Sequence, residues 1–228
     1  ILFSDKTGTI TGGRLSVVEF FTADGSVYGA DLLAGETALA EQLRLAIGRN
    51  TASMYDESGT VVGGNPTDQA VMYALGEKYY RALQADENVC TGQRQTFNSV
   101  NKFSQAELPA RGVVVYKGAP EVLLARAQYA LNAAGNVVPY DAGALTETIN
   151  AYAARAMRVL AFGYSASAFC TNEVNADTVL IGFAAIRDDV RPEARAAIAE
   201  VQAAGIQVVM VTGSHVMQVS CVRTGNSF

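Results

Sequence analysis

The sequence predicts an α/β fold made of two domains, one of which is interrupted by the other. Residues 192–211 have the pattern of a helix followed by a continuous apolar strand, which is typical of a parallel sheet covered on both faces. Residues 1–4 form a second short apolar strand, the expected partner of the first. The strands and helices of the middle of the chain are therefore expected to be inserted between these two regions.

The best-marked helix of the inserted region begins at Pro66. Asn65 is a favourable N-cap, proline suits the first helical position, and Asp68 favours the positive end of the helix dipole. The apolar residues at helical spacing, which we expect to be buried, are Val71, Leu75, Tyr79 and Ala82. The sequence therefore predicts one helix that continues through residue 82.

The other expected elements follow from periodicity and from turn residues. We expect strands at 15–21 and 26–28, a helix at 36–47, strands within 89–116, helices at 120–131 and 144–157, and strands at 158–164 and 178–186. The helix that begins at Pro192 should bury Ala194, Ile198 and Val201, and Gly205 should end it in the left-handed conformation.

The composition is that of an ordinary globular protein. The chain has 228 residues, of which 50% are hydrophobic and 17% charged, and its net charge of -5 argues against a nucleic-acid-binding protein. The longest apolar run covers residues 178–186, well short of the ~18 to 20 residues that cross a bilayer. Three scattered cysteines predict neither a disulfide framework nor a thiolate metal site.

The strongest chemical signal is the sequence Asp-Lys-Thr-Gly-Thr at residues 5–9. It follows the first strand, and the carboxyl ends of strands in open α/β sheets are where ligands bind. A carboxylate there can attack phosphorus and form an aspartyl phosphate, while Gly8 and the threonines offer donors to phosphate oxygens. The alternative is a plain turn with a solvated Asp-Lys pair, which the complete pentapeptide makes less attractive.

This pentapeptide resembles the phosphorylation motif of the P-type ATPases, in which a further threonine follows, as Thr11 does here. Lys-Gly-Ala-Pro-Glu at 117–121 matches a second family motif without change. Further segments that resemble family motifs in the same order lie at 64–68, 97–102, 158–161, 188–191 and 212–213. Seven resemblances in one order are far more specific than any single short match.

The resemblance implies the domain organisation. A haloacid dehalogenase-like phosphorylation domain with a parallel sheet is expected in two pieces, residues 1–13 and 188–215, and it would be truncated. A nucleotide-binding domain of α+β type with an antiparallel sheet is expected at 14–187. Residues 216–228 stay unassigned.

The resemblance also implies the chemistry. Asp5 would accept the γ-phosphoryl group of ATP, Lys6 and Thr7 would belong to the same catalytic motif, and Asp5 and Thr7 would hold Mg²⁺. The residues that the resemblance assigns to the nucleotide are Asp68, Phe97, Ser99, Lys102, Lys117, Gly118, Arg158, Thr212 and Gly213. Phe97 would stack on adenine, and Asp188 and Arg191 would form the hinge between the domains.

Each of these roles has a simpler structural alternative. Phe97 could be a core aromatic residue, and Lys102 an exposed lysine. Lys117 could be a solvated strand end, Asp68 a residue of the helix start, and Arg158 the partner of a surface carboxylate.

Two other functions compete with the pump hypothesis. A haloacid dehalogenase-like phosphatase would place a second aspartate at position 7, where a threonine hydroxyl cannot act as the proton carrier. A module that only binds nucleotide is the other alternative, because the family's Gly-Asp-Gly-x-x-Asn-Asp segment is absent and Ser214 replaces the aspartate of Thr-Gly-Asp. We expect the isolated chain to bind ATP and to phosphorylate itself weakly or not at all.

The resemblance also implies the partners and the location. The parent would be an integral membrane cation pump, with the calcium branch favoured, and its membrane and actuator domains would be the partners of this chain. The chain itself would be a soluble segment at the cytoplasmic face of the membrane.

Overall fold

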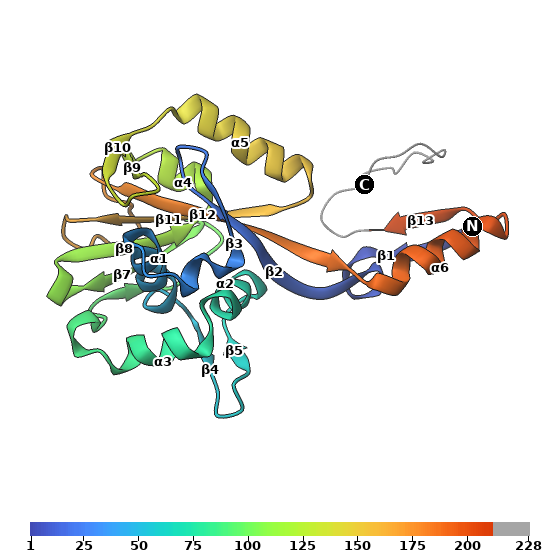
Figure 1. Ribbon diagram of the computed structural model, residues 1–228, viewed down its shortest axis with the longest axis horizontal. Helices are drawn as coiled ribbons and strands as arrows, with labels where there is room; N and C mark the ends of the chain where they lie inside the picture. The colour runs from blue at the N-terminus through green and yellow to red at the C-terminus, as the bar shows by residue number, and fades with distance from the viewer. Residues whose placement is uncertain (212–228) are drawn as a thin grey trace. The chain divides into compact units, whose positions relative to one another are not determined.

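Residues 1–211 are described by the computed structural model, and the chain divides into two compact units. The larger unit is Ser16–Arg187, and the smaller one combines Ile1–Leu15 with the part that begins at Asp188. The division falls within two long strands, β2 (Thr11–Phe21) and β12 (Val179–Val190) (Figure 1).

The larger unit is built on a sheet that, within residues 1–211, has nine strands. Seven of them follow the order β10-β9-β12-β11-β8-β7-β6, while β2 pairs with β12 and β3 pairs with β2. The remaining strands are β3 (Val27–Gly29), β6 (Arg94–Gln95), β7 (Phe103–Leu108), β8 (Val113–Gly118), β9 (Tyr129–Leu131), β10 (Val137–Pro139) and β11 (Arg158–Ser165). Neighbouring strands along the series β6-β7-β8-β11-β12 are antiparallel, as predicted. The exception is β9, which runs parallel to β12.

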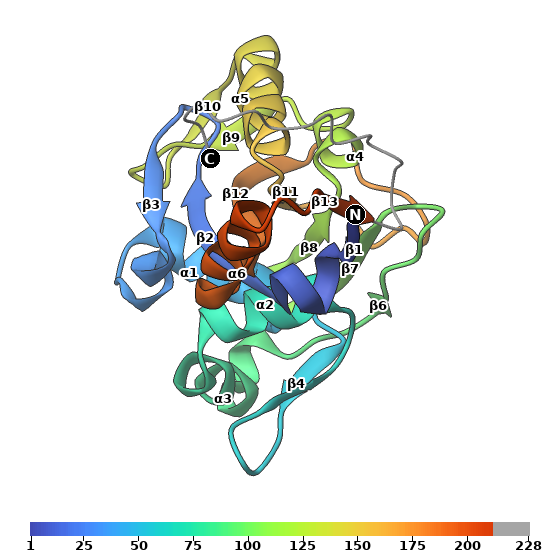
Figure 2. The ribbon, with the colours of Figure 1, turned by 90° about the vertical axis from the view of Figure 1, so that its right-hand side faces the viewer.

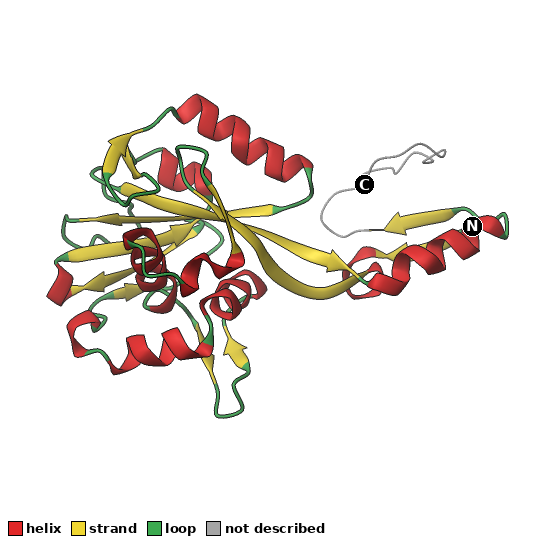
Figure 3. Cartoon of the chain, in the orientation of Figure 1, coloured by secondary structure: helices red, strands yellow, loops and turns green. Residues whose placement is uncertain are grey.

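Helices cover both faces of this sheet. The helices on one face are α1 (Ala38–Gly48), α2 (Pro66–Leu75) and α3 (Glu77–Ala85), and those on the other are α4 (Pro120–Leu124) and α5 (Ala142–Ala154) (Figures 1 and 2). A separate hairpin of β4 (Ser53–Tyr55) and β5 (Val61–Gly63) extends beside α2, and the short helical turns are η2 (Ala30–Ala34), η3 (Glu87–Val89) and η4 (Pro109–Arg111) (Figure 3). No helix within residues 1–211 is long and apolar enough to cross a membrane.

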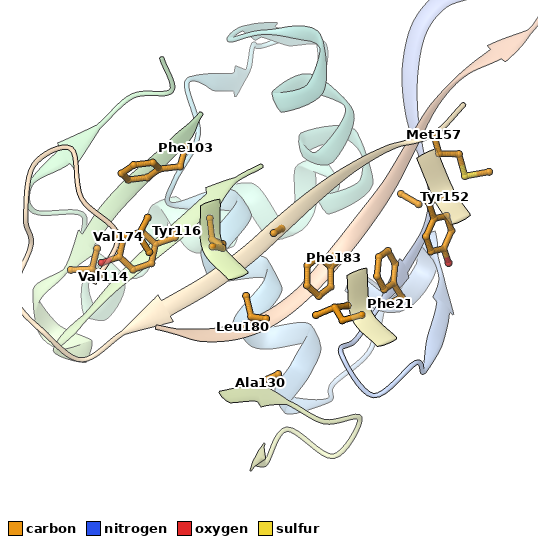
Figure 4. Packing of buried hydrophobic residues seen from close by; sticks show 14 residues of the cluster. Phe21, Phe103, Val114, Tyr116, Ala130, Tyr152, Met157, Val174, Leu180 and Phe183 are labelled. Carbon is orange, nitrogen blue, oxygen red and sulfur yellow. The ribbon is translucent and has the colours of Figure 1, made fainter. Parts of the chain in front are cut away.

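The core under α4 and α5 is aromatic. Phe21 of β2 stacks on Phe183 of β12 and on Tyr152 of α5, with ring centroids 4.9 and 4.7 Å apart (Figure 4). The same cluster continues along the sheet to Tyr116 and Phe103, both of which are buried. Because stacked rings add to the burial of apolar area, this cluster fixes the sheet against α5.

The predicted start of α2 is confirmed, but its predicted length is wrong. The side chain of Asn65 accepts a hydrogen bond from the backbone N–H of Asp68 at 3.0 Å, as an N-cap does. The helix ends at Gly76, whose φ of 80° belongs to the left-handed region, and α3 begins in a new direction. Tyr79 and Ala82 therefore lie outside the buried face of α2: Tyr79 is half-buried and Ala82 is exposed.

The helix predicted at 120–131 is also wrong beyond Leu124. Residues 129–139 form the hairpin of β9 and β10 instead, and Leu131 is buried in β9. The side chain of Asn132 accepts bonds from the N–H groups of Ala134 and Asn136 and closes the turn of this hairpin. Turn chemistry and pairing with β12 thus override the helical spacing of the leucines.

The smaller unit contains the predicted parallel pair of strands. β1 (Leu2–Asp5) pairs in parallel with β13 (Val208–Val211), and α6 (Pro192–Ala203) connects to β13 through Gly205, whose φ is 76°. A helical turn, η1 (Lys6–Ile10), follows β1.

The expected burial of this pair on both faces is wrong for the described residues. Phe3 is 67% exposed, and of the three residues predicted for the inner face of α6 only Ala194 is buried. One helix cannot cover two strands on both faces. The pair does not by itself define the larger parallel sheet that the resemblance implies.

Candidate functional site

A pocket of about 460 Å³ lies in the larger unit, where α2 faces the strands β7, β8 and β11. Five of the predicted nucleotide residues line it, namely Asp68, Phe97, Lys102, Lys117 and Arg158. They come from α2, β8, β11 and the loop between β6 and β7, so residues up to 90 positions apart in the sequence meet in one place.

Asp68 and Lys117 form a buried ion pair at this pocket. Asp68 is 5% exposed and Lys117 6%, and the Lys117 Nζ donates to Asp68 Oδ1. Asp68 Oδ2 accepts four further bonds, from Thr51 Oγ1 at 2.8 Å, the Ala52 N–H at 2.9 Å, and both the N–H and Oγ of Ser53 at 3.0 Å. The carboxylate is therefore satisfied on both oxygens, as a buried charge must be.

Burial and charge act in opposite directions on this pair. Burial alone would raise the pKa of Asp68, but the charge of Lys117 and the hydrogen bonds from Lys117, Thr51 and Ala52 lower it below its usual value. Burial lowers the pKa of Lys117, although the charge of Asp68 opposes that change. The solvated strand end that was the alternative for Lys117 is therefore wrong, because this ammonium is buried and held by a carboxylate.

Phe97 offers an aromatic surface on the loop between β6 and β7. Its side chain is 48% exposed, so the alternative of a core aromatic residue is wrong. An exposed ring at the rim of a concave site is suited to stacking on a flat ligand.

Two further cations of the pocket have protein partners. The guanidinium of Arg158 donates to Thr67 Oγ1 at 2.5 Å, and the Lys102 Nζ lies 3.1 Å from Glu121 Oε1. Both side chains of the Lys102–Glu121 pair are more than half exposed, so their attraction is weak. Lys102 is thus available for an anionic ligand at little cost.

Arg94 is a lining residue that the sequence analysis did not identify. Its guanidinium donates to the backbone carbonyls of Thr51 and Arg49, at 3.3 Å each. The lining therefore includes four cationic side chains and the one carboxylate of Asp68. This excess of positive charge suits a polyanionic ligand. The sequence could have indicated Arg94 only through its position, three residues before Phe97.

Ser99 and Gly118 are not among the lining residues. Ser99 lies in an exposed turn after Phe97, and Gly118 is the buried last residue of β8, paired with Phe103 at the end of the loop. A Cβ atom at Gly118 would lie 2.5 Å from Phe103 Cβ and 2.7 Å from the carbonyl oxygen of Lys102. Gly118 therefore supports the pocket through close packing. Thr212 and Gly213 lie outside the described residues.

In the smaller unit, Asp5 ends β1 and is exposed, while the side chains of Lys6 and Thr7 lie outside the described part. Asp188 accepts from Thr11 Oγ1 at 2.6 Å and from the Gly13 N–H at 3.0 Å. The Arg191 guanidinium donates to the carbonyls of Thr11 at 3.2 Å and Gly8 at 2.9 Å. The two residues predicted as a hinge thus both bind the segment that follows Asp5.

Mg²⁺ is the metal ion that the resemblance assigns to Asp5 and Thr7. Among the described residues, no group of three or more His, Cys, Asp or Glu side chains could hold a metal ion. The prediction that Asp5 and Thr7 hold Mg²⁺ stays a prediction, because the side chain of Thr7 lies outside the described part and Asp5 alone is a partial ligand set.

Comparison with known proteins agrees with the motifs. A family model described as the P-type ATPase cytoplasmic domain N matches residues 38–193. The chain is 33% identical to the plasma membrane-type calcium-transporting ATPase 7 of Oryza sativa subsp. japonica over 232 residues, which are 94% of this chain and 22% of that protein. Calcium-transporting ATPases of Listeria monocytogenes and Bacillus subtilis are 27% and 26% identical, with 94% and 95% of this chain covered.

These relatives are much longer than the chain, which spans 25% of the Listeria protein and 27% of the Bacillus protein. The family model alone covers more than half of the 228 residues and includes the whole set of residues that line the pocket from Asn50 to Leu160. The chain therefore belongs to the P-type ATPase family, and residues 38–193 match its cytoplasmic N domain.

Proposed function

We propose that the larger unit binds ATP in the pocket formed by α2, β7, β8 and β11. The observation that carries this proposal is the combination of an exposed aromatic ring, Phe97, with four cations at a pocket of about 460 Å³. That volume is within the range of small-molecule sites. Adenine would stack on Phe97, and the phosphates would meet the cations Lys102, Arg158 and Arg94.

We further propose that Asp5 is the phosphoryl acceptor of the parent protein. An oxygen of its carboxylate would attack the γ-phosphorus of ATP, the bond from that phosphorus to the bridging oxygen would break, and ADP would leave. The support is the motif at 5–9 and the position of Asp5, exposed at the carboxyl end of β1. Mg²⁺ enters this proposal as the ion that accompanies the phosphates of ATP.

The parent protein is proposed to be an ATP-driven calcium pump. Relatives that cover nearly all of this chain are named calcium-transporting ATPases. On this proposal residues 1–13 and 188–215 belong to a haloacid dehalogenase-like phosphorylation domain, and residues 14–187 are the inserted nucleotide-binding domain. Membrane and actuator domains of the pump are the proposed partners, at the cytoplasmic face of the membrane.

For the chain by itself, nucleotide binding without turnover is the second candidate. It is favoured by the fact that every residue lining the pocket belongs to the larger unit. Acid-stable incorporation of ³²P from γ-labelled ATP separates the two candidates. Incorporation that disappears in Asp5→Asn supports phosphorylation by this chain, and none at saturating ATP leaves it as a binding module. A haloacid dehalogenase-like phosphatase would instead hydrolyse p-nitrophenyl phosphate, and Thr7 predicts that this chain does not.

The binding site itself is tested by calorimetric titration of the chain with ATP. Phe97→Ala should weaken binding by ~1–3 kcal/mol, the scale of one base–aromatic stack. Val100→Ala is the matched control, because Val100 lies on the same loop, is 87% exposed and is not a lining residue. A folded chain that takes up no ATP, or equal affinities in both variants, would rule out this site.

A further inference from the structure

The loop that carries Phe97 and Lys102 has its own internal hydrogen bonds. Asn98 Oδ1 accepts from the N–H groups of Val100 at 3.1 Å and Asn101 at 2.7 Å. The N–H of Lys102 donates to the Asn98 carbonyl at 2.9 Å, and the φ of Lys102 is 59°, in the left-handed region. These bonds shape the loop, but all of them join residues within it.

Asn172 binds this loop at both ends from a distant part of the chain. Its Oδ1 accepts from Asn101 Nδ2 at 2.7 Å, and its N–H donates to Gln95 Oε1 at 2.6 Å. Gln95 precedes the loop and Asn101 is near its end, and they lie 77 and 71 positions from Asn172. One residue therefore spans the stretch on which Phe97 lies.

The backbone of Asn172, which makes these contacts with Gln95 and Asn101, is in an unusual conformation. Its φ is 64°, which asparagine tolerates better than most residues other than glycine. Such conformations persist where the surrounding structure holds them, and they are common at functional sites. Here the Glu173 N–H donates to the Cys170 carbonyl at 3.4 Å, so Asn172 is the third residue of a turn, and its bonds to Gln95 and Asn101 add to this local one.

The segment around Asn172 is itself anchored to the sheet. Gln105 of β7 is fully buried, and its Nε2 donates to the carbonyl of Cys170 at 2.7 Å and to Gln95 Oε1 at 3.0 Å. Asn175 Nδ2 donates to Ser165 Oγ at 3.1 Å at the end of β11. Gln105 thus anchors both Gln95, which precedes the loop, and Cys170, two residues before Asn172.

We propose that Asn172 is a positioning residue for the nucleotide site. It holds the loop so that Phe97 and Lys102 face the pocket before the ligand arrives. The inference rests on the proposed ATP binding, because its effect on affinity is defined only for that ligand. If the loop is correctly placed in only a fraction of the molecules, the apparent affinity for ATP is reduced to that fraction of its intrinsic value.

The first test compares the ATP affinities of two variants by calorimetry. Asn172→Gly keeps the left-handed backbone and removes the bond to Asn101, and it should weaken binding roughly three- to ten-fold. Asn172→Asp keeps both the acceptor and the conformation, and it should stay within about two-fold of the parent chain. Equal ATP affinities for the unmutated chain and Asn172→Gly would overturn the proposal.

Glu173→Gln is the matched control for the charge that Asn172→Asp adds. Glu173 is the next residue, it is exposed, and it pairs with Arg126 at 3.2 Å on the surface. Its change in affinity measures how strongly one charge at this place affects ATP. If Asn172→Gly fails to fold by circular dichroism, Asn101→Ala removes the same hydrogen bond from the other side and carries the same expectation.

The second test needs no nucleotide. The sequence contains no tryptophan, so Phe97→Trp places a single fluorescent reporter on the loop. Adding Asn172→Gly should lower its anisotropy in the ligand-free chain, and adding Asn172→Asp should not. An unchanged anisotropy in the Asn172→Gly background overturns the proposal. If the unmutated chain binds no ATP, the proposed function fails, and the anisotropy alone decides whether Asn172 orders the loop.

Discussion

The hydroxyl of Thr11 donates a hydrogen bond to Asp188 Oδ2 at 2.6 Å, although 177 positions separate the two residues. Thr11 is only 2% exposed, so this hydrogen bond is largely shielded from water. Asp188 Oδ1 also accepts from the Gly13 N–H. The carboxylate of Asp188 therefore links the two separate stretches of the smaller unit directly after the proposed phosphorylation motif, beside the bonds from Arg191.

Asp188→Ala should loosen the segment 8–13 and leave the larger unit intact. It removes the carboxylate that accepts from the Thr11 hydroxyl and the Gly13 N–H, and a hydrogen bond to a charged group contributes about 1.5–3 kcal/mol. We expect faster amide hydrogen exchange at 8–13 and unchanged exchange in β7 and β8. Glu193→Ala is the control, because the Glu193 carboxylate is exposed and lies 4.0 Å from Arg191. Unchanged exchange at 8–13 in Asp188→Ala would show that the segment is held by other contacts.

Lys117→Met should destabilise the larger unit rather than only weaken ATP binding. It leaves the buried carboxylate of Asp68 without its partner charge, which costs about 3–5 kcal/mol. The double variant Asp68→Asn/Lys117→Met should recover part of this loss, because it removes both charges and keeps one amide oxygen as an acceptor. Urea denaturation measures both effects. A single variant as stable as the parent chain would mean that the pair is not buried as described.

The same pair makes stability depend on pH with a defined sign. Because the pKa of Asp68 is lowered in the folded state, its contribution is complete above the unfolded pKa of about 4 and is lost as pH falls through the lower folded pKa. The difference in unfolding free energy between the parent chain and Asp68→Asn should therefore be constant from pH 5 to 7 and shrink below about pH 4. A difference that stays constant in acid would contradict the lowered pKa.

Lys117 also makes the stability of the chain rise with pH, but in the alkaline range. Its folded pKa is lowered by burial, so the folded chain releases this proton before the unfolded chain does. Stability should therefore rise with pH between the lowered folded pKa of Lys117 and its unfolded value near 10.4, in addition to any other titration.

Local signals in the sequence were sufficient for some elements and not for others. The start of α2 was predictable because Asn65 and Pro66 act within one turn of the helix. The break at Gly76 was not predicted, because apolar residues continue at helical spacing through Tyr79. Leu131 was misplaced for a related reason, since its strand exists only by pairing with β10 and β12.

The site was predictable where family motifs reach it. Phe97 and Lys117 lie in such motifs, and both line the pocket. Arg94 and Asn172 carry no motif, and their importance follows from contacts with residues 43 to 77 positions away. Contacts of this kind depend on the assembled sheet, which is why the sequence alone did not identify them.

Gly118→Ala should disturb the pocket through the contact of β8 with Lys102 and Phe103. The added Cβ would lie 2.5 Å from Phe103 Cβ and 2.7 Å from the Lys102 carbonyl, which also accepts from the Ala119 N–H at 2.9 Å. Relieving such a contact moves backbone and typically costs about 1–3 kcal/mol. We therefore expect a lower urea midpoint together with weaker ATP binding, because Lys102 must shift.

The control for this variant is Gly143→Ala in α5. An added Cβ there would lie 3.2 Å from Asp141 Oδ1, the oxygen that caps α5, so this side chain must shift by a few tenths of an ångström, and alanine is favoured over glycine in a helix by roughly 0.5–1 kcal/mol. Its midpoint should be unchanged or higher, and its ATP affinity unchanged. If Gly118→Ala behaves in the same way, the close packing of β8 against Lys102 and Phe103 does not determine the position of the loop.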